Sequence, residues 1–97
     1  MASWSFSQAA EQEFESIKLF YAWHRATPTG DSVISALLDR IQLVAAHPLV
    51  LPVDARGIRR SPLSRLPYCI SYEYEQACDW VHVLSVSHSR REQPSLR

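Results

Sequence analysis

The stretch YCISYEYEQACDWVHVLSV, residues 68–86, decides the fold. Every second side chain in its first half is aromatic or aliphatic: Tyr68, Ile70, Tyr72 and Tyr74. This alternation is typical of a strand with one buried face. Residues 80–86 are apolar on both alternating sets, as expected for an interior strand. A short segment separates the two, which predicts a hairpin of strands over about 68–74 and 80–88.

Before this hairpin the sequence predicts a third, peripheral strand. Residues 57–63 follow a Pro-bounded apolar loop and begin at Gly57. Pro62 lies within them and lacks a backbone N–H, so the strand should lie at a sheet edge. At the other end of the chain, Trp4-Ser5-Phe6 could add a short extra strand.

Two amphipathic helices are expected in the first half of the chain. Ser7 is a suitable N-cap for a helix over about 8–24, and apolar residues recur along it at spacings of three and four. Asp31 or Ser32 should cap a second helix over about 31–46, which ends at His47-Pro48 because the residue before proline avoids the helical region. The expected inward-facing stripe of the first helix is Ala10, Phe14, Ile17, Tyr21 and His24, and Phe20 and Trp23 widen that face. The expected stripe of the second helix is Ile34, Leu37, Leu38, Ile41, Val44 and Ala45.

These elements predict an α+β fold in which an N-terminal antiparallel helix hairpin packs on a three- to four-stranded antiparallel sheet. Ninety-seven residues suffice for one domain, here 1–97, with one core. Leu84 and Val86 should join Tyr72 and the second helix in that core. The three tryptophans are expected in the core or at its edge: Trp4, Trp23 and Trp80.

Composition excludes several classes of protein. Net charge is zero, which gives no global case for nucleic-acid or membrane binding, but residues 49–97 carry seven arginines against five acidic side chains. Neither a secretory signal nor a long apolar run is visible, so a cytoplasmic protein is expected. In the predicted hairpin Cys78 lies near the turn and Cys69 lies several residues away from it, so the two sulfur atoms should be too far apart to form a disulfide. The histidines show no metal-ligand spacing with Cys or Asp, so neither a metal site nor a cofactor is expected.

An ordered series of short motifs runs through residues 59–94. Arginines enter the first strand, a Pro-Tyr step opens the second, and a histidine followed by basic residues ends the third: Arg59-Arg60, Pro67-Tyr68, His88, Arg90-Arg91 and Pro94. This order resembles the RelE/ParE family of toxins from type II toxin–antitoxin modules, the plasmid-stabilisation type. Two more segments are similar to ParE-like members: Phe6-Ser7 with Ala10, Phe14 and Tyr21, and Ile41 with His47-Pro48.

The resemblance implies one of two activities. RelE-like members cut messenger RNA on the ribosome, and ParE-like members inhibit DNA gyrase without being enzymes. RelE-like toxins carry an arginine after the aromatic residue that opens the middle strand, a second after the last strand, and a tyrosine or histidine near the C-terminus. Here Cys69 and about Ser89 stand at the arginine positions, and no tyrosine follows Tyr74. His88 is the only candidate acid or base, and it would be catalytic only in a ribonuclease.

The sequence therefore favours a ParE-like toxin that arrests growth by binding a macromolecular target, by resemblance DNA gyrase, and is not an enzyme. Two alternatives stay open: a ribosome-dependent mRNA endonuclease, and an inactive family member that serves only as a binding scaffold. The expected partner is a cognate antitoxin, in a toxin–antitoxin hetero-oligomer. The residues expected to bind target or antitoxin are Arg59, Arg60, Arg65, His88, Arg90 and Arg91.

Two helices cannot cover both faces of a sheet, so an edge or groove should remain open. The apolar loop 49–51 and the edge strand near Arg59–Pro62 are its expected borders. An antitoxin tail could add a strand to that edge or lay a helix in the groove, with its acidic side chains on the arginines. Arg59 and Arg60 should point to opposite faces of their strand, so only one of them can join a given patch.

Overall fold

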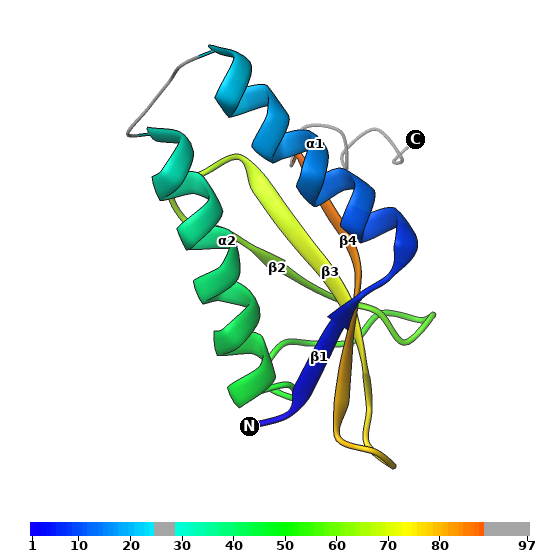
Figure 1. Ribbon diagram of the computed structural model, residues 1–97. Coiled ribbons are helices and arrows are strands. Elements are labelled where there is room, and N and C mark those ends of the chain that lie inside the picture. Colours follow the sequence, from blue (N-terminus) through cyan, green and yellow to red (C-terminus); the bar gives the residue numbers. More distant parts are fainter. Residues whose placement is uncertain (25–28, 89–97) are drawn as a thin grey trace.

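A computed structural model describes residues 1–24 and 29–88 (Figure 1). The elements follow the order β1 (Ser3–Phe6), α1 (Gln8–His24), α2 (Thr29–Ala46), β2 (Arg59–Pro62), β3 (Tyr68–Glu75) and β4 (Trp80–His88). The strands form one sheet in the order β1-β4-β3-β2, and Figure 1 shows α1 and α2 on the same side of it. The two-helix, four-strand α+β architecture expected from the sequence is confirmed, and no described helix is long and apolar enough to cross a membrane.

The sheet is mixed rather than purely antiparallel, which corrects the expected fold in one detail. β2, β3 and β4 pair antiparallel, whereas β1 lies parallel to β4 with Ser3 opposite Trp80 and Phe6 opposite Val83. The segment Trp4-Ser5-Phe6 is a strand, as the sequence suggested, and it makes β4 interior. Its direction had no local signal because its partner lies at the far end of the chain.

Three other expectations need correction. α2 begins at Thr29, two residues before Asp31. Gly30 lies in the first turn of this helix, where glycine is tolerated because the N–H groups have no intrahelical partner. β2 is shorter than 57–63, because Gly57, with a φ of +84°, belongs to the preceding turn. Phe20 and Trp23 are exposed, with 51% and 81% of their surface accessible, so the inner stripe of α1 is narrower than its apolar composition suggests.

The core lies between the helices and one face of the sheet. Its fully buried side chains include Leu37 and Ile41 of α2 and Ile70, Tyr72, Val81 and Val83 of the central strands. Ile34 and Leu38 pack against this cluster while only partly buried. Trp4 does the same from β1. Alternation placed Tyr68, Ile70 and Tyr72 in the core as expected, but Cys69 and Ser71 between them are buried as well.

A β-bulge moves one expected core residue out of the core. Tyr72 lies opposite Val83 and Ile70 lies opposite Val86, so the register shifts between them and leaves an extra residue in β4. Val83 and Val86 both face the core, and Leu84 between them is only partly buried. The prediction that Leu84 is a core residue was wrong because an extra residue in a strand reverses the alternation.

Candidate functional site

The start of α1 is joined to the edge of β4 at the point where β1 ends. Ser7 Oγ accepts a hydrogen bond from Ala10 N at 3.0 Å, as an N-cap does, and donates to the Leu84 carbonyl at 3.0 Å. One turn further along α1, Glu13 Oε1 accepts the Val86 N–H at 2.8 Å. Two side chains of α1 therefore satisfy strand groups that β1 is too short to reach.

This junction forms one wall of a groove that ends at His88. Polar and apolar side chains of α1 line one side of the groove: Gln12, Glu13, Ser16, Ile17 and Phe20. His88, at the end of β4, lies on the other side. The His88 ring packs edge-on against Tyr68 at 5.6 Å between centroids, and Tyr68 Oη lies 3.4 Å from Tyr21 Oη. No arginine or lysine is among the described residues that line this groove, and its one charged side chain is the Glu13 carboxylate.

The arginines at β2 lie elsewhere, and the register separates them as expected. Arg59 lies opposite Tyr72 and donates to the Leu51 carbonyl, on the side of the sheet that the helices cover. Arg60 lies opposite Ser71, on the other side, and its guanidinium is 3.3 Å from Asp54 Oδ2. The two therefore belong to different surfaces.

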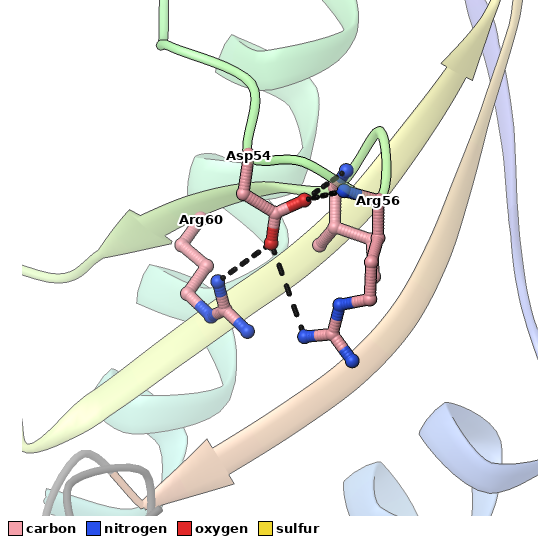
Figure 2. Close-up of polar contacts among 4 residues, drawn as sticks. Asp54, Arg56 and Arg60 are labelled. Atoms are coloured by element: carbon pink, nitrogen blue, oxygen red, sulfur yellow. Dashed lines mark hydrogen bonds and ion pairs between the residues drawn. The ribbon is translucent and has the colours of Figure 1, made fainter. Parts of the chain in front are cut away.

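Asp54 organises the turn that leads into β2 (Figure 2). Its Oδ1 accepts the backbone N–H groups of Arg56 at 2.8 Å and Ile58 at 3.0 Å, while Oδ2 faces the guanidinium groups of Arg60 at 3.3 Å and Arg56 at 3.9 Å. The hydrogen bond from the Ile58 N–H, followed by that from the Arg56 N–H, lowers the pKa of Asp54 below its ordinary 3.8. Arg60 is thus partly neutralised within the chain. The sequence analysis did not single out Asp54, although an Asp three residues before a Gly is a turn signal.

A different hollow takes the third arginine. Arg65 lies in the β2–β3 loop and lines a groove against α2 together with Asp39, Arg40, Leu43, Leu63 and Leu66. Its side chain has no partner among the described residues. The candidate set from the sequence is therefore divided: among the described residues, no two of His88, Arg59, Arg60 and Arg65 line the same groove. Arg90 and Arg91 lie outside the described residues.

The cysteines carry no site. Cys69 is buried in β3, Cys78 is exposed in the β3–β4 turn, and no disulfide joins the two. Partial desolvation of the Cys78 thiol, followed by its hydrogen bond to Glu75, raises its pKa above the ordinary value. A thiol with a raised pKa is a weak nucleophile at neutral pH. In the described part of the chain, no cluster of His, Cys, Asp and Glu has the arrangement of a metal site.

Comparison with known proteins defines the class. Three solved structures share the fold. The chromosomal ParDE system of P. aeruginosa matches with a TM-score of 0.71 and 14% identity, covering 91% of this chain and 96% of that one. The intact E. coli RelBE toxin–antitoxin complex matches with a TM-score of 0.67 and 16% identity over the same shares. The isolated E. coli RelE toxin matches with 0.68 and 16%, covering 98% of this chain and 92% of that one.

Sequence comparison gives the family. Residues 5–93 match the family described as the ParE toxin of the type II toxin–antitoxin system parDE. None of the curated protein sequences matches. The chain belongs to the ParE toxin family, and the resemblance drawn from its motifs is confirmed.

Proposed function

We propose that this toxin arrests growth by binding a macromolecular target, DNA gyrase, rather than by cutting RNA, and that a cognate antitoxin neutralises it in the cytoplasm. The observation that carries the proposal is the chemistry around His88. Phosphodiester cleavage needs positive charge at the scissile phosphate as well as an acid or base. The described lining of the His88 groove supplies a carboxylate and no guanidinium.

The middle strand supports the same choice. Cys69 occupies the position after Tyr68, where RelE-like toxins carry an arginine, and it is buried with 6% of its surface accessible. A buried thiol cannot reach a phosphate on the surface. Tyr68 lines the same groove as His88 with 8% of its surface accessible, and its ring packs edge-on against the His88 ring.

The test is induced expression followed by two readouts. Growth should stop, the purified protein should inhibit gyrase supercoiling, and messenger RNA ends mapped by primer extension should show no codon-phased breaks. The matched variant is His88→Ala, which removes the acid or base expected from the sequence and should leave RNA ends unchanged. Ribosome-dependent breaks that His88→Ala abolishes would establish the endonuclease instead, and absence of growth arrest would favour the scaffold.

A further inference from the structure

Arg40 of α2 occupies an unusual position for a helical surface arginine. Its Nη1 donates to Ser61 Oγ and to the Pro62 carbonyl, both at 3.1 Å. Ser61 is buried and lies on the edge strand β2. Arg40 therefore ties α2 to the outer edge of the sheet. The sequence analysis passed over it because it lies in the acidic half of the chain, away from the other arginines.

These bonds close the edge of β2 to an added strand. Pro62 has no N–H to donate, and Arg40 already occupies its carbonyl. At the other end of β2, Val53 forms an isolated bridge to Arg59 and takes the place an incoming strand would need. A partner that approaches here must contact side chains rather than extend the sheet.

The side chains at this place are suited to an acidic amphipathic helix. Both Arg40 bonds use Nη1, which leaves the Nε–Nη2 edge, the geometry that holds a carboxylate by two parallel hydrogen bonds. Arg65 lies in the same groove, and within the described residues neither arginine has a carboxylate partner. Leu43, Leu63 and Leu66 supply apolar contact between them, in a hollow of about 320 Å³.

We infer that the groove between α2 and the β2–β3 loop holds an acidic, leucine-containing helix of the antitoxin, with its carboxylates on Arg40 and Arg65. This inference rests on the proposed function for the existence of that partner. Arg59 is not part of this groove, since its guanidinium donates to the Leu51 carbonyl. Asp39 is the one acidic side chain in the groove and opposes such a helix.

The test is isothermal titration of the purified toxin with the protein encoded by the neighbouring antitoxin frame, at low and high salt. Arg65→Glu should weaken binding by about tenfold or more, since it replaces attraction by repulsion at a groove carboxylate. Arg56→Glu changes the net charge equally but lies on the Asp54 turn, and it should change binding less than twofold. Arg40→Lys keeps the charge but loses the two-pronged geometry and should weaken binding. Asp39→Asn should tighten it.

The results of this titration test the proposed groove separately from the proposed function. Equal dissociation constants for Arg65→Glu and Arg56→Glu would overturn the groove while the antitoxin still binds and neutralises the toxin. An unchanged dissociation constant for Arg40→Lys, or weaker binding by Asp39→Asn, would also contradict it. Failure of the unaltered toxin to bind that protein or to arrest growth would overturn the proposed function, and the inference with it.

Discussion

At the scale of single residues, Asp54 shows how one carboxylate can hold a loop. It accepts two backbone N–H groups with one oxygen and faces two guanidinium groups with the other (Figure 2). Both backbone bonds are shorter than either ion pair. The exposed ion pairs are worth little in water, so the backbone hydrogen bonds are the main reason for the order of this turn.

The charge on Asp54 should make this turn sensitive to acid. Its pKa is lowered in the folded protein, chiefly by the Ile58 and Arg56 N–H groups, so its contribution is present above pH 3.8 and is lost as the pH falls through the folded-state pKa. Asp54→Asn keeps an oxygen acceptor and loses the charge. Thermal unfolding measured against pH should show the wild type more stable near neutrality, with the difference vanishing in acid. A difference that persists unchanged below that range would contradict the assignment.

At the scale of elements, α1 completes a strand edge that β1 leaves unfinished. Ser7 and Glu13 bond to the Leu84 carbonyl and the Val86 N–H, which belong to the extra residue of the β4 bulge and to the residue two positions after it. A helix packed on a sheet commonly contributes apolar contact. Here it also contributes hydrogen bonds to the sheet backbone, which fixes its position along β4.

Removing the Glu13 carboxylate should therefore destabilise the fold. Glu13→Ala leaves the Val86 N–H without its partner, and an unsatisfied buried donor costs about 1–3 kcal/mol. Glu13→Gln retains an acceptor oxygen and should cost less. Urea unfolding monitored by tryptophan fluorescence would compare the two. Equal stability of the alanine and glutamine variants would show that water replaces the side chain at this position.

The limits of the sequence prediction are visible in the same elements. The Ser7 cap and the bounds of α1 follow from local patterns and were confirmed. The helix stripe and the strand alternation were confirmed only in part, because Phe20 and Trp23 are exposed and Cys69 and Ser71 are buried. The bulge at Leu84 has no local signal, because it depends on how β4 meets β3. The opposite orientations of Arg59 and Arg60 follow from strand geometry and were predicted, whereas the contact of Arg40 with β2 depends on the fold and has no local signal.

At the scale of the whole molecule, stability depends on one thin core between two helices and one sheet face (Figure 1). Leu37 is fully buried, whereas its neighbour Leu38 is only partly buried. A core of this size has few alternative packings to compensate for a lost side chain.

Leu37→Ala should cost about 2–5 kcal/mol of unfolding free energy, as expected for a large-to-small change at a fully buried site. Leu38→Ala, the matched neighbour, should cost less because part of its side chain already contacts solvent. Chemical denaturation of both variants gives the measurement. A Leu38→Ala variant less stable than Leu37→Ala would show that the helix is rotated about its axis relative to the structure.

The parallel pairing of β1 with β4 affects the order in which the protein can fold during its synthesis. Ser3 pairs with Trp80, so β1 is synthesised well before β4, the strand with which it pairs. Contacts of such long sequence separation form late and slowly during folding. Until β4 has emerged from the ribosome, Ser7 and Glu13 lack the backbone groups of β4 to which they bond in the folded protein. α1 therefore gains these hydrogen bonds to the sheet only after β4 has been synthesised.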